Sequence, residues 1–119
     1  MASAYKKISQ SDADNPNLVK VVCDNLNNAI YFSRAKIPYP RESFDDYKGH
    51  IGIYAYSVKS LNEFCNFDES ILENIEKLEQ LRALSNGKKI AMCELATESI
   101  GIDTKEDLEL ALKKFKSQI

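Results

Sequence analysis

Short β-branched and aromatic runs in the first half of the chain predict a hairpin followed by another strand. The run VKVVCD at residues 19–24 is strand-like, NLNN at 25–28 has the composition of a turn, and AIYFSR at 29–34 fits a returning strand. The run GHIGIYAYS at 49–57 predicts the next strand. Residues 1–18 are polar, and a loop is marked there by Asp12, Asp14, Asn15, Pro16 and Asn17.

Apolar positions at helical spacing begin after this strand. They predict a short amphipathic helix at residues 58–66. Ser70 and Glu73 have the spacing of a capping box, and Asn86-Gly87 is a typical stop, so one continuous helix is expected between them. The apolar stripe of that helix is expected to face the core: Leu72, Ile75, Leu78 and Leu81.

The last third of the chain predicts one more strand and one more helix. The strand is KIAMCEL at residues 89–95, and residues 96–103 lead to a helix that Thr104 opens, with Asp107 three residues on. The expected buried face of this helix is Leu108, Ala111, Leu112 and Phe115. Strands and helices are mixed over 119 residues, which favours a single α/β domain with a three-layer arrangement.

The strand at 49–57 contains the only histidine of the chain, His50. Read with a period of two, one face is apolar and is expected to face the core: Ile51, Ile53 and Ala55. The opposite face carries His50, Gly52, Tyr54 and Tyr56, which suits the floor of a site for a polar ligand. Along an ideal strand, His50 and Tyr54 lie about 13 Å apart. That distance favours binding over general-base catalysis for His50, because the two side chains could not share one proton transfer.

Two charged residues fall within the apolar stripe of the helix expected at 70–86. Glu79 and Arg82 either form an ion pair at the edge of the core or turn toward a ligand. Gln80 lies off the stripe on a helical wheel, which alone predicts a solvated side chain. The pattern leaves both interpretations of Glu79 and Arg82 open.

Asp103 and Arg34 stand at the ends of predicted elements. Asp103 is either a carboxylate stabilised by the helix N-terminus or a metal ligand, and Mg²⁺ would need a second carboxylate from elsewhere. Arg34 follows the strand at 29–34 and is either a surface charge or a clamp for an anion. The sequence pattern does not decide between these.

Composition excludes several classes of partner. Hydrophobic residues make up 44% and charged residues 29% of the chain, and the formal net charge is −2 with both signs interspersed. Neither nucleic acid nor an anionic membrane surface is expected as a partner. No apolar run has the length of a membrane span and the N-terminus has no apolar core of a signal peptide, so a cytoplasmic location is expected.

Two features that the sequence lacks, paired cysteines and a phosphate-binding loop, limit the kinds of site that the chain could form. The three cysteines, Cys23, Cys65 and Cys93, are far apart in apolar contexts, so buried free thiols are expected rather than a metal or redox site. No glycine-rich phosphate loop is present, and a self-contained nucleotide site is therefore not expected.

Several motifs occur together in a characteristic order. They are NPNLVKVVCDNLNNAIYFSRAKIPYPR, HIGIYAYS, LENIEKLEQLRAL and GIDTKEDLELAL. This set closely resembles the C-terminal half of the CMP-Kdo synthetases, the 3-deoxy-manno-octulosonate cytidylyltransferases. The resemblance covers nearly the whole chain.

The resemblance implies a three-layer fold of the nucleotide-diphospho-sugar-transferase type, here its C-terminal half over residues 1–119. It also implies a reaction, used in lipopolysaccharide biosynthesis, in which CTP and the sugar acid Kdo give CMP-Kdo and pyrophosphate with Mg²⁺ as cofactor, in a homodimer. The residues that match the sugar-binding positions of the family are His50, Tyr54, Glu79, Gln80 and, at the arginine of FSRA, Arg34. Asp103 matches the metal-binding, catalytic aspartate.

The chain departs from the family in several respects, among them NFDES at residues 66–70 in place of a segment that usually contains proline. Gly49 precedes His50 where the family usually has arginine, and the family's N-terminal nucleotide-binding half is absent. We therefore expect a fragment, one half of a split enzyme or a truncated form, without turnover by itself. The alternative is a non-catalytic interaction or regulatory domain that keeps the fold. A transferase acting on a related sugar acid, such as a sialic acid, fits the motifs less well.

Overall fold

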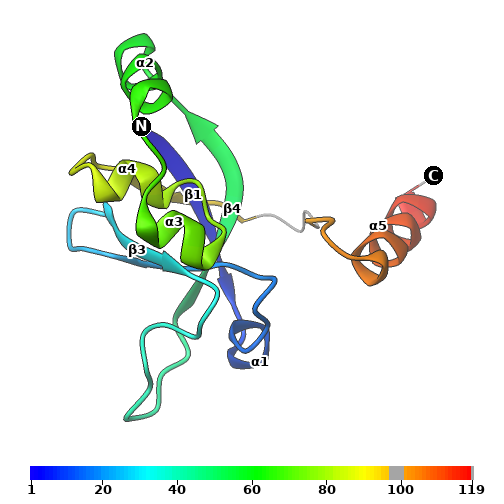
Figure 1. Ribbon diagram of the computed structural model, residues 1–119. Coiled ribbons are helices and arrows are strands. Elements are labelled where there is room, and N and C mark those ends of the chain that lie inside the picture. The colour runs from blue at the N-terminus through cyan, green and yellow to red at the C-terminus, as the bar shows by residue number, and fades with distance from the viewer. Residues whose placement is uncertain (97–100, 119) are drawn as a thin grey trace.

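A five-stranded mixed sheet with strand order β3-β2-β4-β1-β5 forms the centre of the structure, a computed structural model that describes residues 1–96 and 101–118 (Figure 1). Its strands are β1 (Ala2–Ile8), β2 (Lys20–Cys23), β3 (Ala29–Ser33), β4 (Tyr47–Ala55) and β5 (Ala91–Glu94). The helices are α1 (Gln10–Ala13), α2 (Val58–Asn66), α3 (Ile71–Glu76), α4 (Leu81–Ser85) and α5 (Lys105–Gln118). Neighbouring strands are antiparallel except β1 and β5, which are parallel. The expected α/β class is confirmed.

The predicted hairpin is present as β2 and β3. Its turn is held by Asp24, whose Oδ1 accepts the backbone N–H groups of Leu26 and Asn28, both at 2.9 Å. Asn27 adopts the left-handed conformation with φ of 60°, which asparagine tolerates better than most residues. The turn chemistry of NLNN therefore determines where the chain reverses.

The sequence prediction for residues 1–18 missed two elements, because β1 and α1 lie there. β1 is the fourth strand in the sheet order and pairs with β4 on one side and β5 on the other. Its sequence, ASAYKKI, has few β-branched residues, so local propensity gives little sign of a strand. Tertiary pairing on both edges stabilises β1 instead.

The helix expected over 70–86 is divided into α3 and α4. The capping box of Ser70 and Glu73 is present as predicted, but Lys77 ends α3 in the left-handed conformation with φ of 57°. The helical wheel therefore does not continue from α3 into α4. Of the predicted stripe, Leu78 and Leu81 are buried, whereas Leu72 is 43% and Ile75 is 72% exposed. That half of the stripe prediction was wrong.

Apolar side chains pack on both faces of the sheet. One cluster contains Tyr5 of β1 with Phe32 of β3 and Leu81 of α4. The other contains Ile8 of β1 with Ala13 of α1 and is completed by Tyr47. Tyr5 and Ile8 are three positions apart on one strand, so their side chains point to opposite faces. Helices on both sides of the sheet give the three layers expected.

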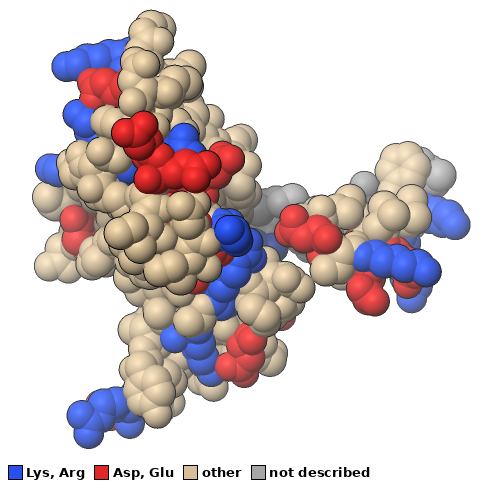
Figure 2. All heavy atoms as spheres, viewed as in Figure 1, with Lys and Arg blue, Asp and Glu red and all other residues tan. Residues whose placement is uncertain are grey.

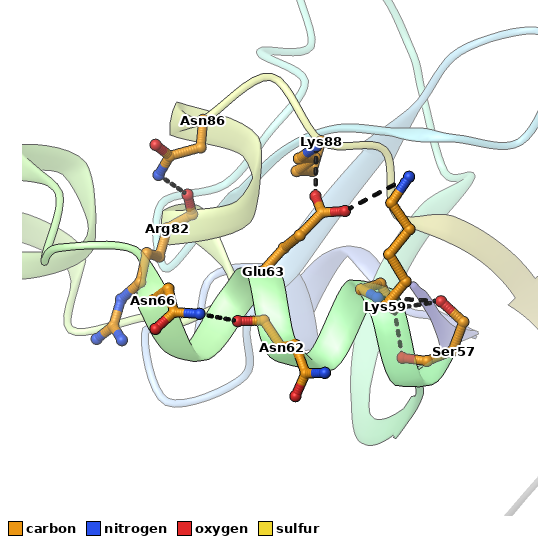
Figure 3. A network of polar contacts seen from close by, with 9 residues as sticks. Ser57, Lys59, Asn62, Glu63, Asn66, Arg82, Asn86 and Lys88 are labelled. Atoms are coloured by element: carbon orange, nitrogen blue, oxygen red, sulfur yellow. Dashed lines mark hydrogen bonds and ion pairs between the residues drawn. The ribbon is translucent and has the colours of Figure 1, made fainter.

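Helix α2 is attached to the rest of the molecule by Phe64, which packs against the core cluster around Phe32, and by an ion pair of Glu63. Glu63 lies between Lys88, at 2.5 Å, and Lys59, at 4.0 Å, as Figure 3 shows. Ser57 caps the helix by accepting the backbone N–H of Ser60 at 3.1 Å. The face of the molecule seen in Figure 2 carries both signs of charge, with acidic side chains gathered near α3 and α4. In the part of the chain that the structure describes, no helix combines the length and the apolarity needed to cross a membrane.

Helix α5 stands apart from the sheet in Figure 1. Its predicted start is confirmed, because Thr104 Oγ1 accepts the N–H of Asp107 at 3.1 Å and Asp107 Oδ2 accepts the N–H of Thr104 at 3.1 Å. The predicted buried face was wrong. Leu108 is 45%, Leu112 47% and Phe115 61% exposed, since no described element covers them. Residues 97–100, part of the predicted connection to this helix, lie outside the described residues.

The cysteines are free thiols, as predicted, but two of them are not buried. Cys65 and Cys93 are exposed and Cys23 is half-buried. Apolar neighbours in sequence therefore gave a wrong prediction of burial for two of the three.

Candidate functional site

A row of aromatic rings runs along β4 and joins it to its neighbours. The ring centroids of Phe32 and His50 are 4.8 Å apart, and those of His50 and Tyr54 are 5.6 Å apart. Tyr54 stacks on Tyr56 at 6.1 Å, and Tyr56 contacts Phe64 of α2 at 6.2 Å. The face of β4 that carries His50 is thus packed against other rings.

The apolar face predicted for β4 is covered only in part, since Ile51 is half-buried. Ile53 is 58% exposed and Ala55 is exposed, so the apolar face expected to meet the core is open over these residues. Edge-to-face contact between rings favours burial of the His50 and Tyr54 side instead. Period-two alternation identified which residues share a face but not which face is covered.

A β-bulge explains why His50 and Tyr54 are much closer than an ideal strand allows. Ser3 of β1 is opposite Tyr54, but the next residue, Ala4, is opposite Ile51. Gly52 and Ile53 are therefore extra residues on β4, and such insertions bend a strand. The expected separation of about 13 Å between ideal positions was wrong for the side chains, whose rings touch.

His50 is a neutral ring at ordinary pH. Burial lowers its pKa to about 4, because the charged imidazolium would lose its hydration. Its Nε2 atom lies 2.8 Å from Ser3 Oγ. The ring is therefore suited to hydrogen bonding rather than to holding a positive charge.

Tyr54 keeps its phenolic proton over the whole physiological range. Burial, followed by the charges of Tyr56 and Glu79, raises the pKa of Tyr54 to about 12. A protonated phenol can donate one hydrogen bond and accept others. Tyr54 is thus a further neutral polar group beside His50.

A cavity of about 530 Å³ brings together most of the predicted site residues. Its lining includes Arg34, His50, Tyr54, Gln80 and Asp103, five of the six that the sequence predicted. They come from the end of β3, from β4, from the start of α4 and from the segment before α5. A second cavity of about 570 Å³ shares His50 and Asp103 with the first. Cavities of this size accommodate small molecules of the dimensions of a sugar.

Gln80 lies at the cavity because the predicted helix is broken. Its side chain is 5% exposed, in contrast to the solvated position that a continuous helical wheel gives. Residue 80 immediately precedes α4, and the left-handed Lys77 redirects the chain before it. The wheel prediction of a solvated Gln80 was therefore wrong, because Gln80 is buried and lines the cavity.

Glu79 is exposed and does not belong to the lining of either cavity. The ion pair considered for Glu79 and Arg82 was wrong, because Arg82 pairs with Glu73, Nη2 to Oε2 at 2.5 Å. Glu79 is still close enough to Tyr54 and Tyr56 for its charge to raise the pKa of both phenols, after the larger effect of burial.

The guanidinium of Arg34 donates hydrogen bonds to three backbone carbonyls. Its Nε donates to Glu76 O at 2.8 Å, Nη1 to Pro16 O at 3.2 Å and Nη2 to Lys77 O at 3.3 Å. Glu76 Oε1 accepts the backbone N–H of Arg34 at 3.0 Å. The guanidinium thus ties the end of α3 to the loop before β2 and carries further N–H donors on Nη1 and Nη2 that a ligand could use.

The buried Lys20 holds the loop that forms another wall of the cavity. Its side chain is fully buried, and Nζ donates to Asn15 O at 2.8 Å and to Leu18 O at 2.5 Å. Burial, followed by the charge of Arg34, lowers the pKa of Lys20. Between these two carbonyls lie Pro16 and Asn17, which line the cavity.

Asp103 is the only one of the predicted residues that could ligate a metal through a carboxylate at the cavity edge. Its backbone N–H donates to Asp107 Oδ2 at 3.1 Å, so Asp107 is engaged in capping α5. Over residues 1–96 and 101–118, no group of three or more His, Cys, Asp or Glu residues is arranged to hold a metal ion. The donor chemistry of Asp103 fits a hard cation, with the remaining ligands supplied from elsewhere.

Gly49 is buried in the sheet rather than at the cavity. A Cβ atom at this position would lie 2.7 Å from Ile8 Cγ2 and 3.5 Å from Leu18 Cδ1. The residue therefore faces the cluster around Tyr47. Gly52, in contrast, lines both cavities, and a Cβ there would meet nothing within 4 Å. The missing side chain of Gly52 therefore leaves the backbone of β4 open to both cavities.

Sequence reasoning missed some residues of the site. Asn17 and Val19 line both cavities, and Lys77 lines the smaller one. Ser3 contacts His50 but lies on the strand that was not predicted. No periodicity in the sequence marks these residues. Lys77 has a local structural reason for its position, since it ends α3 in the left-handed conformation.

The comparisons with known proteins agree on one family. A family model described as "Cytidylyltransferase" matches residues 1–90. The 3-deoxy-manno-octulosonate cytidylyltransferase of Wolinella succinogenes is 58% identical over 97% of this chain and 49% of its own length. That of Helicobacter pylori strain ATCC 700392 / 26695 is 51% identical over 100% of this chain and 51% of its own length.

A solved structure agrees in fold as well. CMP:2-keto-3-deoxy-manno-octonic acid synthetase complexed with CTP matches with a TM-score of 0.89 at 38% identity, over 99% of this chain and 49% of that chain. The chain thus spans about half the length of the relatives it matches. With the family model covering residues 1–90 and the fold in agreement, this chain belongs to the cytidylyltransferase family.

Proposed function

We propose that this chain is the sugar-acid-binding half of a 3-deoxy-manno-octulosonate cytidylyltransferase. Such an enzyme transfers CMP from CTP to Kdo, giving CMP-Kdo and pyrophosphate for lipopolysaccharide biosynthesis. The observation that carries the proposal is the cavity lined by Arg34, His50, Tyr54, Gln80 and Asp103 in a chain 58% identical to a relative of that name.

The side chains of the cavity suit a sugar acid. Neutral His50, protonated Tyr54 and the amide of Gln80 offer donors and acceptors for hydroxyl groups without a net charge. The N–H donors of Arg34 not used by the backbone suit the carboxylate. Glu79 is proposed as an additional acceptor for sugar hydroxyls beside Tyr54, once the ligand covers it.

Asp103 is proposed as the catalytic residue that this chain contributes to the metal site. Its carboxylate is a suitable ligand for Mg²⁺, and a further carboxylate outside this chain would complete the site. When bound, Mg²⁺ would neutralise part of the phosphate charge that develops during nucleotidyl transfer. The role of the other four side chains is to hold Kdo so that its attacking hydroxyl faces the nucleotide.

The organisation of the whole enzyme follows from the same proposal. Residues 1–119 form the C-terminal half of the cytidylyltransferase domain, and the nucleotide-binding half, which binds CTP, lies outside this chain. A homodimer in the cytoplasm is proposed for the complete enzyme. The 119-residue chain alone is expected to bind Kdo without releasing pyrophosphate from CTP.

The decisive experiment is a titration of Kdo monitored by the C2–H proton signal of His50, the only histidine. It is carried out with and without Mg²⁺, with a sialic acid as the control ligand. A saturable shift specific to Kdo supports the proposal, and a Gln80→Ala variant should weaken it. A folded chain without any shift would instead favour the non-catalytic interaction or regulatory domain.

A further inference from the structure

Ser3 is a buried hydroxyl that contacts the site without lining it. Its side chain is 4% exposed, and Ser3 belongs to neither cavity. It lies at the β-bulge between β1 and β4, where Ser3 is opposite Tyr54 and Ala4 opposite Ile51. The bulge interrupts the ladder and leaves carbonyls of β4 near the Ser3 hydroxyl.

Three groups converge on Ser3 Oγ. Ile53 O lies at 2.7 Å, Ile51 O at 3.4 Å and His50 Nε2 at 2.8 Å. The two carbonyl oxygens can only accept hydrogen bonds, and a serine hydroxyl has a single hydrogen to donate. Two oxygens 2.7 Å apart require a hydrogen between them, so Ser3 donates to Ile53 O.

In the contact with His50, Ser3 must therefore be the acceptor of the hydrogen bond and His50 the donor. With its hydrogen committed to Ile53 O, Ser3 Oγ can only accept from His50, so Nε2 carries the ring proton. In a neutral imidazole, the other ring nitrogen, Nδ1, is then an acceptor. Among the hydrogen bonds of the described residues, the His50 ring makes only the one through Nε2.

We propose that Ser3 is a positioning residue that fixes His50 as the Nε2–H tautomer and keeps Nδ1 available to accept a hydrogen bond from a hydroxyl group of the ligand. Ser3 acts through His50 and does not touch the ligand. The same hydroxyl stabilises the bulge that brings Tyr54 beside the imidazole. One side chain on β1 thereby determines both the geometry and the hydrogen-bonding polarity of the site.

The ligand assignment rests on the proposed function, whereas the tautomer does not. If the cavity binds Kdo, Nδ1 accepts from a sugar hydroxyl and contributes to selection of a polyhydroxylated ligand. A protonated Nδ1 would have no acceptor to offer there. Ser3 therefore influences affinity for the sugar even though its own hydroxyl stays within the sheet.

The tautomer is tested directly by long-range ¹H–¹⁵N correlation NMR on the uniformly ¹⁵N-labelled chain without ligand. Because His50 is the only histidine, its two nitrogen signals are unambiguous. We expect Nε2 in the protonated, pyrrole-type range and Nδ1 in the unprotonated, pyridine-type range. A protonated Nδ1 would overturn the proposal. So would averaged signals for the two nitrogens, since Ser3 would then not hold the ring.

Variants test whether Ser3 is responsible. In Ser3→Ala, the two ¹⁵N signals should move toward averaged positions and the Nε2 proton should exchange rapidly with water. Ser3→Thr retains the hydroxyl and should keep the wild-type pattern. Ser11→Ala should also leave the pattern unchanged, because the Ser11 hydroxyl bonds to Ser9 at the start of α1. An unchanged pattern in a folded Ser3→Ala variant would overturn the assignment to Ser3.

A second measurement connects the tautomer to the ligand. Kdo should bind Ser3→Ala about tenfold more weakly than Ser3→Thr, because loss of an oriented hydrogen bond costs about 1.4 kcal/mol, the equivalent of tenfold. Equal Kdo affinities would overturn the coupling between Ser3 and the ligand. If no form of the chain binds Kdo while the ligand-free spectra show the expected tautomer, the proposed function fails and the assignment of the tautomer stands.

Discussion

Arg82 of α4 donates two hydrogen bonds to Glu73 of α3, from Nε to Oε1 at 2.9 Å and from Nη2 to Oε2 at 2.5 Å. The pair spans the break at Lys77, and Glu73 also accepts the N–H of Ser70 at 3.1 Å. The hydrogen bond from Arg82 lowers the pKa of Glu73, in spite of the opposing effect of burial. The two short helices are thus fixed relative to each other, with Gln80 between them.

Removing the guanidinium should therefore destabilise the fold. Arg82→Met keeps the aliphatic stem but leaves the buried Glu73 carboxylate without its main partner, which should lower the free energy of unfolding by about 2 kcal/mol. The measurement is urea unfolding at pH 7. Arg41→Met is the matched control, since Arg41 is exposed, and should change the free energy by less than about 0.5 kcal/mol. Equal effects of the two variants would show that the ion pair contributes no stability.

Local chemistry predicted the elements whose ends are determined by neighbouring residues. The hairpin turn at Asn27, the capping box at Ser70 and the start of α5 at Thr104 follow from side chains that bond to the backbone close by. These interactions do not depend on the rest of the fold. The sequence was therefore sufficient for them.

Elements that depend on distant partners were not predictable in the same way. β1 is a strand because β4 and β5 lie on either side of it, and the exposed face of β4 could not be assigned from alternation alone. The bulge that joins His50 to Tyr54 depends on the register between two strands. The cavity residues Gln80 and Arg34 were assigned to a site only by resemblance to a family. Periodicity alone placed Gln80 in solvent and left the role of Arg34 undecided.

The titration of His50 should make stability depend on pH in a defined window. Burial lowers the pKa of His50 to about 4, from 6.5 in the unfolded chain. Between these two values the unfolded state binds more protons than the folded state, so stability falls as the pH falls. The contribution is at most about 1.4 kcal/mol per pH unit. Well above pH 6.5 both states are neutral at this ring and the effect is absent.

This dependence is measured by urea unfolding from pH 7 to pH 4, alongside the NMR titration of His50 C2–H. His50→Phe keeps an aromatic ring and removes the titration, so its stability should fall less steeply than that of the wild type over the same window. Carboxylates that titrate near pH 4 affect both proteins and cancel in the difference. A midpoint near 6.5 for the folded protein would contradict the prediction.

Substitution of Gly49 should be costly, in contrast to substitution of Gly52. In Gly49→Ala the new Cβ would lie 2.7 Å from Ile8 Cγ2, a branch close to the backbone that cannot swing away freely. We expect a loss of about 1–3 kcal/mol in the free energy of unfolding. Gly52→Ala, which meets nothing within 4 Å, should lose less than about 0.5 kcal/mol. Comparable losses for both glycines would contradict the packing around Ile8.

Tyr54 at the end of β4 and Tyr56 just after it allow a matched test of the proposed sugar site. Tyr54 and Tyr56 stack on each other at 6.1 Å, and both phenols have a raised pKa, chiefly through burial. Only Tyr54 lines the cavity that also contains His50 and Gln80. Tyr54→Phe and Tyr56→Phe each remove one hydroxyl and keep the ring, so the stacking is retained in both variants.

We expect Tyr54→Phe to weaken Kdo binding by about two- to tenfold, the range that one hydrogen bond of about 0.5–1.5 kcal/mol supplies. Tyr56→Phe should change the affinity by less than about twofold, since its hydroxyl lies outside the cavity. Calorimetric titration with Kdo measures both, and urea unfolding checks that the two variants are equally stable. If Tyr56→Phe weakens binding as much as Tyr54→Phe, the phenol of Tyr54 makes no specific contact, and the ring row acts on the ligand only through the shape of the cavity.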